Sequence, residues 1–384
     1  MLTMTPAIPE SAMARRGFGN GPPVSLFTLG TMRALESPAQ LEAVLAAAIA
    51  AGINHVETAP AYGPSQRYLG RALRQLAIAP EAVLITSKLL PGCTLQQGQE
   101  QLQRSLEQLG RSQLDNLAVH GINTSEHLEW TLHGPGQALL QWAQEERLVG
   151  QVGFSSHGPN ALIEAAIDSG RFSFASLHLH LLDPARLPLA DQALERGMGV
   201  MAISPADKGG QLWDPPPLLQ QACHPLQPLE LAYRFLIARG ISTLTLGAAS
   251  PDQLQWAQLL GGADGPLTAS EQQALERLNQ QRLDNLGDSH CGQCRACLPC
   301  PSGVPIPELL RLRNLAIGHG MERHARERYA MVGQAGHWFE QINAAACQGC
   351  NQCLPRCPHQ LPIPELLAET HQRLASPPRR RLWG

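Results

Sequence analysis

Short apolar runs alternate with amphipathic stretches between residues 25 and 262. The runs have the length and composition of buried strands: SLFTLG, HVETAP, AVLITSKL, LDNLAVHG, GQVGFSS, FASLHLHLL, GVMAISP and TLTLGAA. Helical periodicity fills the intervals, for example SPAQLEAVLAAAIAAG, QEQLQRSLEQLG and PDQLQWAQLLGG, and several helices end in glycine. Strand and helix repeated eight times predict an α/β fold, a (β/α)8 TIM barrel, over residues 1–265. A doubly wound open sheet is the competing fold.

The pattern changes after the barrel. A helix is predicted over residues 266–288, where Thr268 and Glu271 form a capping box, and we interpret it as a linker. Residues 289–384 contain two cysteine runs, and the stretch between them has helical rather than strand periodicity. A small, mainly α-helical domain is therefore expected at residues 289–384.

Composition excludes some classes of function. The chain has 384 residues, 16% charged residues and a net charge of −3, so electrostatics gives no reason to expect nucleic acid binding. No apolar run approaches 18 residues, and no apolar core follows Arg15 and Arg16, so neither membrane insertion nor a signal peptide is expected. We expect a cytoplasmic protein, in which ten cysteines indicate metal or redox chemistry rather than disulfides.

Eight of the ten cysteines lie in two runs that repeat each other. CGQCRACLPCPSG begins at Cys291 and CQGCNQCLPRCPHQLPIPELL at Cys347, an offset of 347 − 291 = 56, and PIPELL follows in both copies. The second run has the C-x2-C-x2-C-x3-C-P spacing of bacterial ferredoxins, in which the fourth cysteine ligates the other cluster. We therefore predict two [4Fe–4S] clusters, one held by Cys291, Cys294, Cys297 and Cys357, the other by Cys347, Cys350, Cys353 and Cys300.

Other interpretations of the cysteines and the tail are weaker. Structural zinc usually pairs two well-separated C-x2-C knuckles, whereas each run here is contiguous and ends in Cys-Pro. Cys93 and Cys223 stand alone and are interpreted as structural. The basic tail SPPRRRLWG is interpreted as a solvated terminus rather than a docking site for an acidic electron carrier.

Four polar residues follow consecutive predicted strands. Glu57 and Tyr62 follow the second strand, Lys88 ends the third and His120 ends the fourth. In a barrel these ends form the active face. A lysine ammonium would lower the pKa of a neighbouring tyrosine, and the carboxylate would hold the lysine in place. The histidine would orient a substrate carbonyl. The tyrosine could then act as the proton donor in carbonyl reduction. Taken singly, each residue is more commonly structural.

These motifs resemble a known family. GINHVETAPAYGPSQRYLGRAL resembles the aldo/keto reductase signature, while LITSKL and LDNLAVHGI are similar to the lysine and histidine strands of that family. VGFSSHG resembles its nicotinamide carboxamide loop, and GAASPDQL its adenosine phosphate loop. The whole chain resembles aldo/keto reductase proteins with a C-terminal 4Fe–4S domain. The resemblance implies Tyr62 as the general acid and a cofactor, NADPH or NADH, contacted by Ser155, Ser156, Ser204, Gly247 and Gln253.

The sequence departs from the family pattern at several places. Glu57 replaces the usual aspartate, Ser176 a glutamine that binds the carboxamide, and Ile203 an aromatic that stacks on the nicotinamide. GAASPDQLQW contains no arginine or lysine for a 2′-phosphate. These changes leave the choice between NADPH and NADH open.

The motif LHLHL raises a separate alternative. His178 and His180 share one face of a predicted strand, and with His120 they could ligate a metal. We favour the alternative in which they form a hydrogen-bonded polar patch that lines the substrate pocket.

The sequence thus predicts an NAD(P)H-dependent oxidoreductase that acts on a carbonyl or alcohol substrate. The two clusters would exchange single electrons with a carrier protein. Hydride transfer moves two electrons together, whereas each cluster passes one electron at a time. A mediator such as a flavin would normally connect the two processes. A regulatory or structural role for the clusters therefore stays open. The competing hypothesis is a non-catalytic nucleotide-binding redox sensor or electron carrier.

Overall fold

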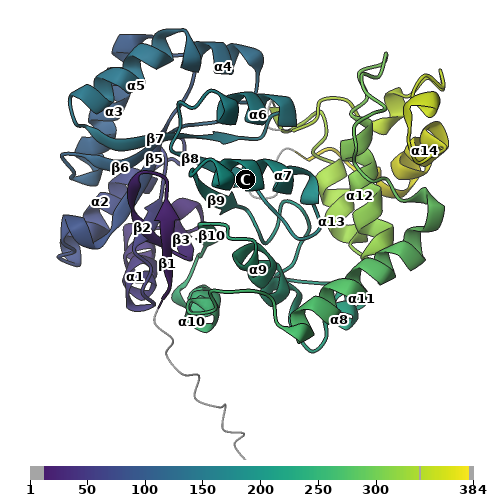
Figure 1. The fold of residues 1–384 in the computed structure, drawn as a ribbon, viewed down its shortest axis with the longest axis horizontal. Coiled ribbons are helices and arrows are strands. Elements are labelled where there is room, and N and C mark those ends of the chain that lie inside the picture. Colours follow the sequence, from purple (N-terminus) through teal and green to yellow (C-terminus); the bar gives the residue numbers. More distant parts are fainter. Residues whose placement is uncertain (1–12, 337–338, 380–384) are drawn as a thin grey trace, which may run out of the picture. The chain divides into compact units, whose positions relative to one another are not determined.

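The computed structural model describes residues 13–336 and 339–379. Its largest feature is a closed barrel of eight parallel strands that follow one another around the barrel in chain order (Figure 1). The strands are β3 (Phe27–Gly30), β4 (His55–Glu57), β5 (Leu84–Leu89), β6 (Leu114–Val119), β7 (Val149–Ser156), β8 (Phe174–His178), β9 (Gly199–Ile203) and β10 (Thr243–Gly247). Seven of them lie within the predicted runs, and β7 begins one residue before its run, at Val149. The (β/α)8 prediction is therefore confirmed, and the open sheet is wrong.

The helices that alternate with these strands have the predicted end signals. Ser37 caps the first helix by accepting a hydrogen bond from the Gln40 amide, and Gly110 ends the third with a φ of 67°. A side-chain cap of this kind contributes about 1 kcal/mol. The helices are α1 (Pro38–Ala50), α2 (Ser65–Gln75), α3 (Leu95–Leu109), α4 (Ser125–Leu132), α5 (Pro135–Glu145), α6 (Asn160–Asp168), α7 (Leu187–Glu195), α9 (Pro228–Ala238) and α10 (Gln255–Leu260).

Contacts divide the chain into two compact units. The first comprises residues 1–205 and 233–266 and contains the barrel, and the second comprises residues 206–232 and 267–384. In the described part of the second unit all regular structure is helical: α8 (Pro217–Cys223), α11 (Ala269–Leu286), α12 (Ile306–Gly318), α13 (Glu322–Tyr329) and α14 (Ile363–Leu374), with short 3-10 turns. No helix within residues 13–336 and 339–379 is long and apolar enough to cross a membrane.

The unit boundaries differ from the expected ones in the connection between β9 and α9. Residues 206–232 pack in the second unit, where Arg277 donates to the carbonyl of Ala222 at 3.1 Å and Gln281 to that of Leu218 at 2.9 Å. The helix expected as a linker is α11, which begins at the predicted Thr268 capping box and packs against α8 and α12.

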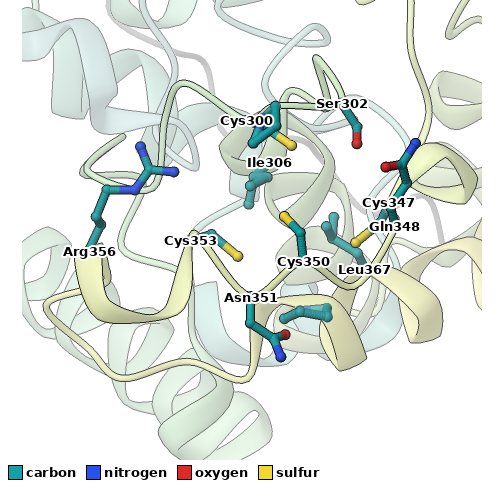
Figure 2. A pocket seen from close by; sticks show the side chains of 12 residues that line it. Cys300, Ser302, Ile306, Cys347, Gln348, Cys350, Asn351, Cys353, Arg356 and Leu367 are labelled. Carbon is teal, nitrogen blue, oxygen red and sulfur yellow. The ribbon is translucent and has the colours of Figure 1, made fainter.

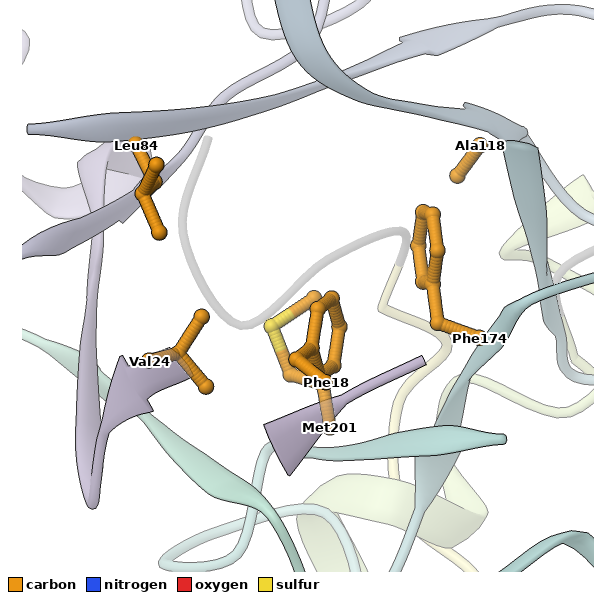
Figure 3. Packing of buried hydrophobic residues seen from close by; sticks show 6 residues of the cluster. All are labelled: Phe18, Val24, Leu84, Ala118, Phe174 and Met201. Atoms are coloured by element: carbon orange, nitrogen blue, oxygen red, sulfur yellow. The ribbon is translucent and has the colours of Figure 1, made fainter. Parts of the chain in front are cut away.

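A β-hairpin that the sequence pattern did not predict precedes the barrel. Its strands are β1 (Arg15–Phe18) and β2 (Gly21–Ser25), which pair antiparallel. Phe18 is fully buried and packs against Phe174, with 5.0 Å between the ring centroids, and against Met201 (Figure 3). The hairpin therefore supplies an aromatic side chain to the barrel core.

A continuous chain of hydrogen bonds connects several barrel strands through buried polar side chains. His55 lies between Thr28 and Thr86, at 2.7 Å from each hydroxyl. Asn116 donates to Thr86 at 3.0 Å and accepts from Gln151 at 2.7 Å. Because these side chains are buried, their pairing offsets the cost of removing them from water.

His55 makes the stability of the barrel depend on pH. Burial lowers its pKa to about 3, whereas an unfolded histidine titrates near 6.5. Between these values the unfolded chain binds the extra proton, so the stabilisation is complete above pH 6.5 and is lost as the pH falls. We expect this group alone to lower the free energy of unfolding by about 2 kcal/mol between pH 7 and pH 5.

Urea denaturation of the wild type and of His55→Gln over this pH range measures the effect. The variant should be less stable at pH 7 but should show a shallower dependence on pH. His133→Gln removes an exposed histidine and serves as the matched control. Equal pH slopes for the wild type and His55→Gln would contradict the assignment.

Candidate active site and cysteine sites

The four catalytic candidates come together at the carboxyl ends of β4, β5 and β6. Lys88 forms an ion pair with Glu57 and donates a hydrogen bond to the Tyr62 hydroxyl. The Tyr62 hydroxyl in turn donates to Oε1 of Glu57 at 3.1 Å. The ring of His120 stands almost perpendicular to that of Tyr62, with 5.7 Å between the centroids. The longer side chain of Glu57 therefore still reaches the lysine.

The charges in this group are buried and balanced. Glu57 and Lys88 are each only 4% exposed, so their ion pair is almost completely removed from water. Burial raises the pKa of Tyr62, which is opposite to the lowering by Lys88 that we expected. Removing the phenol from water disfavours its charged form, and this effect outweighs the neighbouring lysine. Tyr62 is therefore protonated at neutral pH, as a proton donor must be.

The histidines of LHLHL separate in the structure. Strand β8 ends at His178, and Nε2 of His178 lies 2.5 Å from Nδ1 of His157. His180 lies in the following turn, where its Nδ1 accepts from the amide of Leu182 at 3.0 Å. Within the described residues, no three His, Cys, Asp or Glu side chains are grouped as ligands of one metal ion. The structure therefore does not support the alternative of a metal at His120, His178 and His180.

The eight clustered cysteines line two separate pockets of the second unit. One pocket is lined by Cys300, Cys347, Cys350 and Cys353, whose side chains surround a common space in Figure 2. The other is lined by Cys291, Cys294, Cys297 and Cys357. These are the two sets predicted from the ferredoxin spacing, and each takes its fourth cysteine from the other run.

The repeat is visible in the backbone as well. Gln293 and Arg295 of the first run have φ values of 61° and 63°, and Gly349 and Asn351, 56 positions further on, have 65° and 61°. The left-handed conformation is unfavourable for most residues other than glycine and is enriched at functional sites. After the runs, helices α12 and α14 both begin at the isoleucine of PIPELL.

Burial and neighbouring thiols make some of the converging cysteines harder to ionise. Burial raises the pKa of Cys291, and the neighbouring thiols of Cys294 and Cys357 raise it further. Burial also raises the pKa of Cys353, with further contributions from Cys347, Cys350 and Cys300. Cys291 and Cys353 are thus each influenced by other members of their own pocket. Cys93 and Cys223 line neither pocket, and Cys223 is fully buried.

The sequence profile of the aldo/keto reductase family matches residues 27–212, which extend from the first barrel strand to beyond the seventh. The matched segment contains all four catalytic candidates in their observed arrangement. The chain is therefore similar to the aldo/keto reductase family over residues 27–212, just under half of its length. The protein is an oxidoreductase, and the family to which it is similar implies NADPH-dependent oxidoreduction of carbonyls.

Individual aldo/keto reductases are also similar to this chain. An aldo-keto reductase from Mycolicibacterium vanbaalenii is 26% identical over 253 residues, which cover 64% of this chain and 85% of the relative. The holo form of an aldo-keto reductase from Bacillus halodurans has a TM-score of 0.59 at 20% identity and covers 69% of this chain and 96% of its own. An aldo/keto reductase from Brucella melitensis has a TM-score of 0.55 at 20% identity and covers 69% and 98%. These two structural similarities concern the fold.

Two of the predicted cofactor contacts, Ser155 and Ser156, have hydroxyls that form hydrogen bonds within the barrel. Ser155 accepts from the amide of Gly121 at 3.1 Å, and Ser156 donates to the carbonyl of Ile122 at 2.6 Å. Ser176, which pairs with Ser155 across β7 and β8, is fully buried, and its hydroxyl has no hydrogen-bond partner among the described residues. A buried hydroxyl of this kind fits a polar group of a bound ligand.

The remaining predicted contacts lie beyond β9 and β10. Ser204 follows β9 with a φ of 53°, and the preceding residue, Ile203, packs against the buried cluster around Phe18. A Cβ atom at Gly247 would lie 3.4 Å from Cδ of Arg33. Gln253 accepts from the amide of Ala249 at 2.8 Å. Arg33 was not among the predicted site residues, and it brings a cation close to Gly247.

Proposed function

We propose that the protein is an NAD(P)H-dependent carbonyl reductase in which Tyr62 is the proton donor, and that it also carries two [4Fe–4S] clusters. The observation that carries the first part is the buried network of Tyr62, Lys88 and Glu57, with His120 beside it. The cysteine sets of the two pockets support the second part.

In this proposal the bound nicotinamide supplies the hydride, and the protein supplies the proton. The imidazole of His120 would orient the substrate carbonyl next to the Tyr62 hydroxyl. Tyr62 would donate its proton to the oxygen as negative charge develops there. The ammonium of Lys88, already bonded to that hydroxyl, would stabilise the phenolate that remains, while Glu57 holds the ammonium in place.

The cofactor would use groups from several strand ends. Ser176 offers its hydroxyl to the carboxamide, and Ser155 and Ser156, which are bonded internally, shape the same region. The part of the cofactor beyond the nicotinamide would be bordered by Ser204, Gly247 and Gln253. Arg33 beside Gly247 supplies a cation that the GAASPDQLQW loop lacks, which favours NADPH over NADH.

Iron–sulfur clusters suit the cysteine pockets better than zinc. Four thiolates around one zinc ion would stand only about 3.8 Å apart, because each Zn–S bond is about 2.3 Å and the geometry is tetrahedral. A [4Fe–4S] cluster distributes its four cysteines over four irons, so they stand further apart. The structure has no group placed for a single ion within its described residues, yet it gathers four cysteines around each pocket.

The left-handed residues in both runs are consistent with the same ligand. Successive backbone amides in such turns form concave nests that bind anions, and many iron–sulfur sites use them. Residues 289–384 would then be a ferredoxin-type domain that exchanges single electrons with a carrier protein. Iron would also supply the positive charge that the buried thiolates require.

Anaerobic purification followed by two assays tests the two parts separately. For the clusters, we expect about eight irons and as many sulfides per chain. For catalysis, we expect NADPH oxidation with at least one member of an aldehyde panel. Zinc in place of iron would overturn the first part. Tight NADPH binding without turnover of any carbonyl would overturn the second and would favour a redox sensor.

A further inference from the structure

Three buried hydroxyls join the two ends of the loop that carries Tyr62. They belong to Thr31, which follows β3, to Thr58, which follows β4, and to Ser65, the first residue of α2. All three residues are fully buried. The Ser65 hydroxyl lies 2.6 Å from that of Thr31 and 2.7 Å from that of Thr58. The Thr31 hydroxyl also lies 3.0 Å from the carbonyl oxygen of Glu57.

The chemistry of the partners fixes the direction of these hydrogen bonds. A hydroxyl has one proton to donate, and a carbonyl oxygen can only accept. Thr31 donates to the carbonyl of Glu57, so it must accept from Ser65. Ser65 has then used its proton, so it must accept from Thr58. The hydroxyls thus form an ordered chain from Thr58 to the carbonyl of Glu57, and the peptide bond between these two residues closes it into a ring. We call it the hydroxyl ring.

The hydroxyl ring encloses the loop at residues 59–64. Thr58 precedes this loop and Ser65 follows it, so the hydrogen bond between them holds the two ends together. Within the loop the amide of Tyr62 donates to the carbonyl of Ala59 at 3.1 Å, and the amide of Ser65 donates to the carbonyl of Tyr62 at 3.2 Å. The backbone from which the phenol extends is therefore bonded on both sides.

Glu57 belongs both to the hydroxyl ring and to the charged group around Tyr62. Its carbonyl accepts from Thr31, whereas its carboxylate pairs with Lys88 and accepts from the Tyr62 hydroxyl. The ring thus fixes the backbone that carries the carboxylate as well as the loop that carries the phenol. Such placement matters for rate, because a shift of about 1 Å at a reacting group can cost about a hundredfold.

We infer that Thr31, Thr58 and Ser65 are positioning residues, whose hydroxyl ring holds the Tyr62 phenol in place for proton transfer. This inference rests on the proposed function of Tyr62. Stability alone gives little reason for three hydroxyls in a fully buried site, because apolar groups of the same shape could replace hydrogen-bonded partners at little cost. A closed ring of directed hydrogen bonds instead favours one arrangement of the loop ends.

The test compares Thr58→Val with Thr58→Ser in the full-length, cluster-loaded protein. Valine keeps the shape of threonine without its hydroxyl, whereas serine keeps the hydroxyl. We expect Thr58→Val to lower kcat for an aldehyde about tenfold, with KM and the Kd of NADPH unchanged within about twofold. Thr58→Ser should keep kcat within about twofold of the wild type. Wild-type kcat in Thr58→Val would overturn the inference.

Thr243→Val is the matched control for Thr58→Val. Thr243 is equally buried, and its hydroxyl lies 2.7 Å from that of Thr28, so the same substitution removes a comparable hydrogen bond elsewhere in the barrel. It should leave kcat unchanged. A fall in kcat equal to that of Thr58→Val would overturn the inference, because the loss would then follow from any buried hydroxyl of the barrel.

A double-mutant cycle tests whether the hydroxyl ring acts through Tyr62. In the Tyr62→Phe background the proton donor is already lost, so Thr58→Val should lower the residual kcat no further. A tenfold fall in both backgrounds would point to a general structural role and would overturn the inference.

Hydrogen exchange tests the ring without any turnover. If the wild type reduces no aldehyde, the proposed function fails, but the amides of Tyr62 and Ser65 still report how firmly the loop is held. We expect Thr58→Val to speed exchange in a peptide spanning residues 59–66 about tenfold, and Thr243→Val to match the wild type. Unchanged exchange in Thr58→Val would overturn the inference whether or not the protein reduces a carbonyl.

Discussion

Tyr62→Phe is expected to lower kcat for carbonyl reduction by about 10²–10⁴-fold, the usual contribution of a positioned proton donor. The substitution removes one oxygen atom and keeps the ring that faces His120. It also leaves the ion pair between Glu57 and Lys88 intact, so folding should change little. Stopped-flow measurement of NADPH oxidation with a saturating aldehyde isolates the chemical step.

Tyr68→Phe is the matched control for this prediction. Tyr68 lies on α2, where Arg67 stacks over its ring at 5.7 Å, and its loss should leave kcat unchanged within about twofold. Lys88→Met is a less clear test, because it leaves the buried carboxylate of Glu57 unpaired at a cost of about 3–5 kcal/mol. Wild-type turnover by Tyr62→Phe would assign the proton donor to another group.

Pairs of cysteine substitutions are expected to show that each cluster takes its fourth ligand from the other run. Cys300→Ala with Cys350→Ala removes two ligands from one pocket and none from the other, so about four irons and one [4Fe–4S] signal should remain. Cys300→Ala with Cys294→Ala removes one ligand from each pocket, so no intact four-cysteine site should remain.

If each run held its own cluster, the results would be reversed. The pair Cys294 and Cys300 would then lie in one site and would leave an intact cluster, whereas the pair Cys300 and Cys350 would leave none. Electron paramagnetic resonance of the dithionite-reduced proteins reads the number of intact clusters independently of iron analysis. Cys93→Ala, which changes a cysteine that lines neither pocket, is the control.

The barrel could be predicted because its strands are buried on both faces and therefore appear as continuous apolar runs. The catalytic candidates followed from the same argument, since Lys88 is the second-last residue of one strand and His120 follows the next. The separation of the cysteines into two sets also followed from spacing alone. In each case the signal lies in a short stretch of chain with a fixed relation to its neighbours.

Other features depend on contacts between distant residues. The hairpin β1–β2 contains two prolines and several glycines, so its strands have no apolar alternation, although Phe18 fills the barrel core. His157 was visible in VGFSSHG, but only the register of β7 and β8 brings it to His178. The pKa of Tyr62 was expected to fall because the sequence shows the lysine but not how deeply the phenol is buried.

The assignment of residues 206–232 to the second unit has a consequence for protein engineering and for evolution. A stop codon after residue 266 would delete the partners of this segment and leave α8 without the helix that it packs against. Truncation at this position would therefore not remove the second unit as a whole, because part of that unit lies within the sequence of the barrel. If the two units were once joined by gene fusion, the connection between β9 and α9 has since become part of the second unit.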